Sequence, residues 1–181
     1  GLTLKSRTEF RKTEYDSALE YANKALQSGI YDPTANYLSG IAYWAQKDAL
    51  NALEAFGWAA RAIQYRSVSY AQMAEIHLHQ GNLETAEEYA SKALDFNQHN
   101  LNARQVLLVV HRLNNDSSAF NEQLSGISKI SPIHHFASFE EILFSNKEPN
   151  LILKYIQNEF TNETLLELAL SYLNLGQKET A

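Results

Sequence analysis

Apolar residues recur along the chain at the three- and four-residue spacing that places them on one face of an α-helix. The stretch LLELALSYLNLGQKETA, from residue 165 to 181, predicts one such helix, a glycine turn and the first residues of another element. Its apolar face carries Leu165, Leu168 and Tyr172, and covering each of these side chains is worth about 1.5–3 kcal/mol. We therefore expect that the chain is cut within a structural unit and that a following helix covers this face.

Small residues repeat at a period of 34 residues. The segments EYDSALEYANKAL, DALNALEAFGWAA and GNLETAEEYASKAL align without gaps. An alanine seven residues after another alanine produces a helix stripe that a second helix can approach closely. The aligned alanines are Ala18, Ala52 and Ala86, followed by Ala25, Ala59 and Ala93.

A second helical pattern precedes each alanine pair, so each unit is predicted to be a helix, a turn and a helix. Gly40 is followed three residues later by Tyr43, and Tyr70, Met73 and Ala74 hold the corresponding places in the next unit. Gly81-Asn82 predicts the turn of that unit. Asp32-Pro33 predicts a helix start, with the aspartate as N-cap and the proline at the first helical position.

These residues closely resemble the tetratricopeptide repeat, a 34-residue helix pair. The resemblance implies an all-α fold of antiparallel helix pairs stacked in a right-handed superhelix. Its consensus places small residues at repeat positions 8, 20 and 27 and large ones at 4, 7, 11 and 24. Two units match it well, through Gly40, Tyr43, Ala52, Phe56 and Ala59 in one, and through Tyr70, Met73, Ala74, Ala86 and Ala93 in the other.

The register predicts a single helical-repeat domain over residues 1–181, truncated at both ends. In a fourth, weaker unit Phe120 and Ile127 replace the alanines, which implies looser or shifted packing. Residues 2–10 would form the poorly matching first helix of the first unit. The predicted parts are repeats at about 1–32, 33–66, 67–100 and 101–132, a nonconsensus helix pair at 133–160, and a partial repeat at 161–181.

The composition excludes several classes of function. The net charge is −6 and the charges are mixed, so the chain lacks the basic stripe that binding to a nucleic-acid backbone requires. No apolar run is long enough for a membrane-spanning helix, so we predict neither a nucleic-acid nor a membrane partner. The absence of cysteine excludes disulfides, zinc-thiolate sites and cysteine nucleophiles, but it does not decide the compartment.

The titratable residues predict no metal site and no catalysis. His77 and His79 lie about 200° apart around a helix, so they cannot hold a metal together, and His77 is expected to pack between helices. His134 and His135 are expected to cap or pack at a helix start. Adjacent carboxylates such as Glu87-Glu88 indicate solvated helix surface, and no phosphate loop or nucleophile motif is present. We therefore expect a protein segment that is not an enzyme and has no cofactor.

The resemblance also implies a binding groove, because ligands of tetratricopeptide proteins lie along the first helix of each pair. We expect a protein or peptide partner, or an adjacent domain of the same chain, to bind there. For Tyr37 and Trp44 the sequence favours packing against neighbouring helices or a flanking domain, and partner binding is the other interpretation. The groove residues carried over from the family are Tyr37, Ile41, Trp44, Gln72, Glu75, His79, Gln105 and Arg112.

Three stretches resemble the C-terminal repeat region of large bacterial proteins that carry an upstream galactose-mutarotase-like domain of uncharacterised function. These stretches are FGWAARAIQYRSVSYAQMAEIHLHQGN, NQHNLNARQVLLVVHRLN and SPIHHFASFE. The resemblance implies an alternative function, an accessory region of a carbohydrate-active enzyme. Homo-oligomerisation through the exposed ends of the stack is a third hypothesis.

Overall fold

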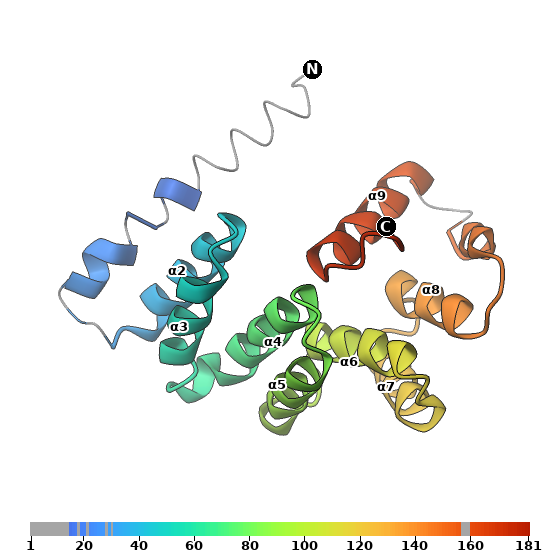
Figure 1. Ribbon diagram of the computed structural model, residues 1–181, viewed down its shortest axis with the longest axis horizontal. Coiled ribbons are helices and arrows are strands. Elements are labelled where there is room, and N and C mark those ends of the chain that lie inside the picture. The colour runs from blue at the N-terminus through green and yellow to red at the C-terminus, as the bar shows by residue number, and fades with distance from the viewer. Residues whose placement is uncertain (1–14, 18, 21, 28, 30, 157–159) are drawn as a thin grey trace, which may run out of the picture. The chain divides into compact units, whose positions relative to one another are not determined.

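The computed structural model describes residues 15–17, 19–20, 22–27, 29, 31–156 and 160–181, and every regular element among them is helical (Figure 1). The predicted helix at 2–10, together with Ala18 and Tyr21, lies outside the described residues. The chain falls into two compact units, Gly1–Met73 and Ala74–Ala181, and each is described by itself.

Unit 1 contains a helical segment within residues 15–27, then α2 (Pro33–Ala45), α3 (Ala49–Ala59) and the start of α4 (Ile63–His79). The predicted start of α2 is confirmed, because the Asp32 carboxylate accepts a hydrogen bond of 2.7 Å from the Ala35 backbone N–H and Pro33 follows the cap. Asp48 caps α3 in the same way, through the backbone N–H of Asn51. These caps satisfy N–H groups that have no partner within the helix.

Small residues let α2 and α3 pack closely. Ala52 and Ala59 are fully buried, as the 34-residue register predicts, and Phe56 between them is also fully buried. Ala25, the corresponding alanine of the first unit, is exposed, so the prediction of close packing at this position is wrong. Gly40 of α2 lies so close to the Phe56 ring that an added Cβ would be 2.6 Å from ring atom Cε1. The small residue at this position is therefore required by the packing of a large one on the neighbouring helix.

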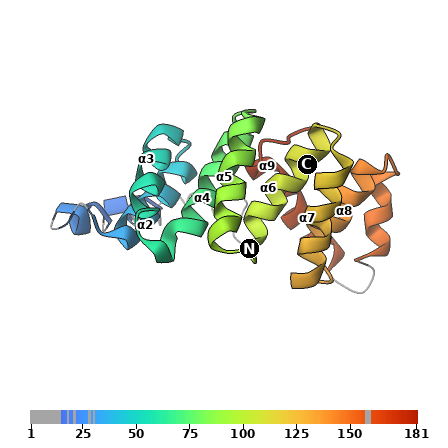
Figure 2. The ribbon, with the colours of Figure 1, turned by 90° about the horizontal axis from the view of Figure 1, so that it is seen from below.

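Unit 2 contains the end of α4 and a series of neighbouring helices, of which α5 to α8 follow one another in Figure 2. Ala86 and Ala93 of the first of these helices are fully buried, in agreement with the predicted register. The elements are α5 (Leu83–Phe96), α6 (Leu101–Leu113), α7 (Ser117–Ile130), α8 (His135–Phe144), the 3₁₀ helix η1 (Pro149–Lys154) and α9 (Thr161–Asn174).

The large residues that replace alanine in α7 are packed against α8. Phe120 and Ile127 are almost fully buried and cluster with Leu108 and Ala137. The Phe120 ring stacks on Phe144 with 4.2 Å between ring centroids. The Phe144 ring of α8 thus lies beside α7 and packs against the cluster that contains these larger side chains.

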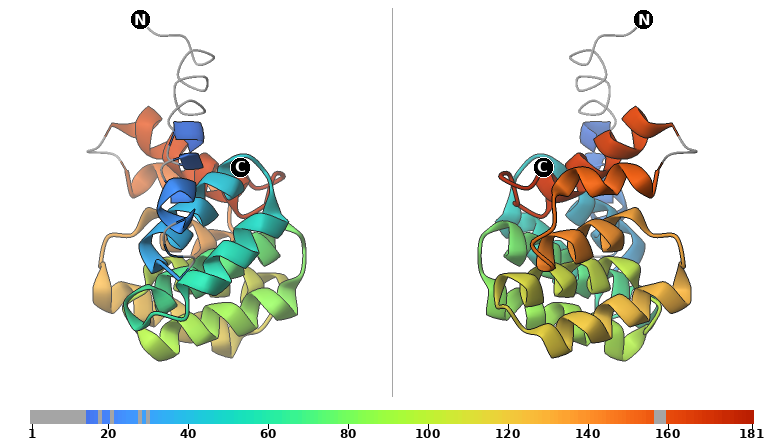
Figure 3. Two further views of the ribbon diagram at one scale, coloured as in Figure 1. Left: turned by 90° about the vertical axis from the view of Figure 1, so that its left-hand side faces the viewer. Right: turned by 90° about the vertical axis from the view of Figure 1, so that its right-hand side faces the viewer.

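The C-terminal third departs from expectation at two places. The second helix predicted within 133–160 is the six-residue 3₁₀ helix η1, which begins at Pro149, and the bond from the Tyr155 N–H to the Ile152 carbonyl has 3₁₀ spacing. On the face of α9 that was expected to need a following helix, Leu168 and Tyr172 are already buried, whereas Leu165 is half-buried. The Tyr172 ring contacts Phe136 and Phe139 of α8, which lies beside α9 (Figure 3).

His134 caps α8, as the sequence predicts, and His77 packs against another ring. The backbone N–H of Ala137 donates to Nδ1 of His134 over 3.3 Å. His77 stacks on Tyr89 with 5.4 Å between the centroids. Burial lowers the pKa of both histidines, and at His134 the neighbouring His135 adds to this effect, which a local backbone hydrogen bond opposes.

We predict opposite effects for two glycine-to-alanine changes. Gly40→Ala should lower the free energy of unfolding by about 1–3 kcal/mol, because the new methyl group meets the buried Phe56 ring. Gly57→Ala, in an exposed part of α3 where an added Cβ meets nothing within 4 Å, should raise it by up to about 1 kcal/mol through helix propensity. Urea unfolding measures both, and equal effects would contradict the close packing at Gly40.

Acid should destabilise the fold through His134 and His77. Folding lowers the pKa of each histidine below its unfolded value of about 6.5. At a pH between the folded and the unfolded pKa, the unfolded chain therefore binds more protons than the folded chain. The free energy of unfolding should thus fall as the pH drops from 7.5 toward 5. His134→Asn keeps a capping residue that does not titrate and should reduce this slope. Urea unfolding across this pH range is the measurement. His99→Asn, in the exposed loop before α6, is the matched control, and the same slope change in both variants would refute the prediction.

Candidate functional site

The predicted groove residues of unit 1 lie mainly on α2. Tyr37, Ile41 and Trp44 follow one another at helical spacing on one stripe, and all three are half-buried. The centroid of the Tyr37 ring lies 5.6 Å from that of Phe56 on α3 and 5.4 Å from that of Tyr65 on α4. Tyr37, on α2, therefore packs against two other helices. Its packing agrees with the interpretation that the sequence favours for Tyr37.

The structure also shows the surroundings of two other predicted groove residues of unit 1, Trp44 and Gln72. The ammonium group of Lys47 lies 5.2 Å from the centroid of the Trp44 ring, within the range of a cation–π contact. Gln72, on α4, is half-buried. A binding role for these residues stays a prediction.

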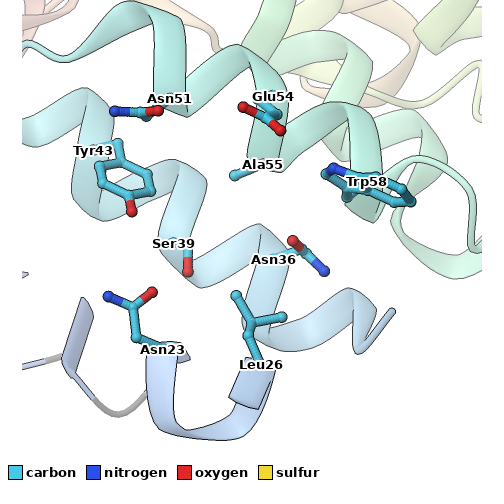
Figure 4. Close-up of a pocket in the computed structure, with 9 residues that line it drawn as sticks. All are labelled: Asn23, Leu26, Asn36, Ser39, Tyr43, Asn51, Glu54, Ala55 and Trp58. Carbon is cyan, nitrogen blue, oxygen red and sulfur yellow. The ribbon is translucent and has the colours of Figure 1, made fainter. Parts of the chain in front are cut away.

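A cavity of about 370 Å³ lies beside α2, between the helical residues 22–27, α2 and α3 (Figure 4). Sequence reasoning did not identify it as a site. Aromatic and aliphatic side chains and amides line it together. The lining residues are Asn23, Leu26, Asn36, Ser39, Tyr43, Asn51, Glu54, Ala55 and Trp58.

The cavity exists because two positions carry small polar residues. Counted from Pro33, Asn36 and Ser39 stand at repeat positions 4 and 7, where the tetratricopeptide consensus has large side chains. Ser39 is only 1% exposed, its Oγ has no hydrogen-bond partner among the described residues, and Figure 4 shows this oxygen directed into the space. These two departures from the consensus are the sequence signal that could have located the cavity.

The predicted groove residues of unit 2 lie beside the C-terminal part of the chain. On α4, Nδ1 of His79 lies 2.9 Å from the backbone carbonyl oxygen of Asn174, at the end of α9. Glu75 and Gln105, both half-buried, line a cavity of about 170 Å³ together with Asn174 and other residues near the end of α9. The Gln105 amide also lies 3.4 Å from Nε2 of His134. The structure therefore brings these predicted residues together around a segment of the same chain.

Arg112, the last predicted groove residue, belongs to a buried polar chain. Its Nε donates to Oε2 of Glu140 over 2.8 Å, and the Tyr172 hydroxyl donates to Oε1 of the same carboxylate over 2.7 Å. Glu140 is fully buried, so both contacts compensate a charge that has left water. Burial raises the pKa of Tyr172 far above its usual range, and the negative Glu140 adds to this effect, so the phenol stays a hydrogen-bond donor.

The described residues contain no group of three or more His, Cys, Asp or Glu side chains arranged to hold a metal ion. Within the same part of the chain, no helix is both long enough and apolar enough to cross a membrane. What the geometry offers is a cavity with mixed lining in unit 1 and, in unit 2, a helix surface in contact with α9.

Comparison with known proteins agrees with the repeat register. Residues 68–100 match the family model of the tetratricopeptide repeat. No curated protein matches the chain. The crystal structure of YrrB, a TPR protein with an unusual peptide-binding site, is similar to this chain with a TM-score of 0.59 and 16% sequence identity. That match covers 93% of this chain and 85% of YrrB. The chain therefore has a tetratricopeptide-like all-α fold and contains at least one recognisable tetratricopeptide repeat.

Proposed function

We propose that this chain is a noncatalytic helical-repeat scaffold that binds a protein or peptide partner. The proposal is supported by the tetratricopeptide repeat at 68–100 and by the likeness to YrrB, a TPR protein with an unusual peptide-binding site. The proposal rests mainly on the cavity of about 370 Å³ in unit 1, which is large enough for one anchoring side chain of a partner.

The lining suits an anchor with an apolar body and one polar atom. Leu26, Tyr43 and Trp58 offer apolar surface, while the buried Ser39 hydroxyl has no hydrogen-bond partner in the described part of the chain and can give or accept one bond. The ring of Trp58 is held from outside by an edge contact with Tyr31 and by the guanidinium of Arg61. A few well-packed anchors of this kind dominate the free energy of binding at protein interfaces.

The groove residues named from the sequence remain part of the proposal. Ile41 and Trp44 follow Tyr37 along α2, about a third of a turn around the helix from the cavity positions Asn36 and Ser39. A partner that inserts an anchor into the cavity can extend over this stripe, and Gln72 is proposed to contribute from α4. In unit 2, His79 already contacts the end of α9 and Arg112 contacts α8, so a partner would reach them by displacing part of the chain. An upstream galactose-mutarotase-like domain stays a prediction from the resemblance alone.

Filling the cavity should abolish peptide binding. We would select a phage-displayed library of random peptides on the full chain and measure the dissociation constants of the selected peptides by fluorescence anisotropy. Ser39→Leu restores a large side chain at repeat position 7 and should weaken binding at least about tenfold, or about 1.4 kcal/mol. Ser39→Ala keeps the volume and should change the affinity much less. Trp44→Ala tests the groove stripe in the same assay.

Leu50→Ala is the matched control, because Leu50 is 78% exposed on α3 and does not line the cavity. It should leave the affinity unchanged. Far-UV circular dichroism confirms that each variant is folded. The proposed function would be refuted if the selection enriched no peptide. It would also be refuted if the selected peptides bound Ser39→Leu and Trp44→Ala as tightly as the wild type.

A further inference from the structure

We propose that the groove surface of unit 2 is a receptor for the C-terminal turn of a helix and that α9 is its occupant in the same chain. The recognised elements are a tyrosine, a leucine three residues later and a glycine directly after it, which are Tyr172, Leu175 and Gly176 here. The inference deepens the proposed function, because it names the occupant of four predicted groove positions: Glu75, His79, Gln105 and Arg112.

The surface binds the end of α9 through its backbone. The last carbonyl groups of a helix have no partner within the helix, and the carbonyl oxygen of Asn174 can only accept a hydrogen bond. Nδ1 of His79 lies 2.9 Å from this oxygen, so this nitrogen carries the proton of the bond. A histidine at this place also suits the partial negative charge at a helix C-terminus.

Gly176 is required by the same contact. Its φ of +76° lies in the left-handed region that ends many helices and favours glycine. An added Cβ would lie 2.8 Å from both the Cα and the carbonyl oxygen of His79, which are backbone atoms and cannot move aside as a side chain can. The helix end therefore fits the surface of α4 only with glycine at this position.

Tyr172 is the side-chain anchor. It is fully buried, its ring stacks on Phe136 with 4.9 Å between centroids, and its hydroxyl donates to Glu140. Arg112 holds the other oxygen of that carboxylate. A buried aromatic ring with a single satisfied polar atom resembles the hot spot of a binding interface.

The rest of α9 is weakly attached. Among its residues only Leu168 and Tyr172 are buried, whereas Leu166, Leu170 and Leu173 are each more than 40% exposed. Phe160, directly before the helix, is 81% exposed. A helix with so few buried side chains opens locally at a smaller free-energy cost than global unfolding.

Opening of α9 would expose the receptor to an outside helix with the same ending. The apparent affinity of such a competitor is reduced by the fraction of molecules in which α9 has left. Weakening the attachment of α9 should therefore increase binding of the competitor, although no receptor residue has been changed.

The test compares two glycine variants of the full chain and uses a fluorescein-labelled peptide of residues 161–181 as the probe. Gly176→Ala should lose amide hydrogen-exchange protection in 161–174 and should bind the probe at least about tenfold more tightly than the wild type. Gly81→Ala is the matched control, because Gly81 also has a left-handed φ, +81°, but an added Cβ meets nothing within 4 Å. It should behave as the wild type in both measurements.

Two further measurements keep the test decisive. Tyr172→Phe in the chain removes only the hydroxyl and should cause a smaller change in the same direction as Gly176→Ala. A probe peptide that carries Gly176→Ala should bind the opened chain much more weakly than the unchanged probe. Thermal melting followed by circular dichroism confirms that the variants retain their fold.

Unchanged protection of 161–174 in both Gly176→Ala and Tyr172→Phe would overturn the proposal. Equal probe binding by wild type, Gly176→Ala and Gly81→Ala, or binding by none of them, would also overturn it. The result is independent of the proposed function, because the probe is a segment of this chain. A chain that binds no library peptide but gains probe binding on Gly176→Ala would refute the proposed function and support the receptor.

Discussion

The close approach of paired helices at small residues is the constraint on which the rest of the structure depends. Ala52 and Ala59 in unit 1, and Ala86 and Ala93 in unit 2, are all fully buried. A larger side chain at any of them would separate the helix axes, because protein interiors are packed to crystal-like density. Gly40 shows the strictest case, since the Phe56 ring occupies the place where a Cβ would be.

Two departures from this pattern, one toward larger and one toward smaller side chains, have opposite effects on the local packing. Phe120 and Ile127 are larger than the alanines they replace, and the chain accommodates them in a buried cluster that includes residues of α8. Asn36 and Ser39 are smaller than the consensus residues, and no side chain among the described residues fills the space beside them. The first departure extends the core, whereas the second leaves the cavity on which we base the proposed function.

The polar groups of unit 2 show how the repeat surface can hold a ligand-like element. Glu140 would be costly to bury alone, and it is tolerated because Arg112 and Tyr172 satisfy both of its oxygens. The same two contacts connect α6, α8 and α9. A buried charge thereby specifies where α9 lies, and the backbone contact between His79 and Gly176 specifies its end.

The sequence by itself determined the all-α class, the helix pairs, the Asp32 cap and the buried alanines of α3 and α5, because these features depend on residues that are near one another along the chain. Only the tertiary structure decided that η1 is a 3₁₀ helix and that α9 lies on the predicted groove residues. Its decisive contacts join residues 28, 32 and 95 positions apart, in Arg112–Glu140, Tyr172–Glu140 and His79–Asn174. Helical periodicity reports which face of a helix is apolar, but the path of the chain between helices determines which distant surface covers that face.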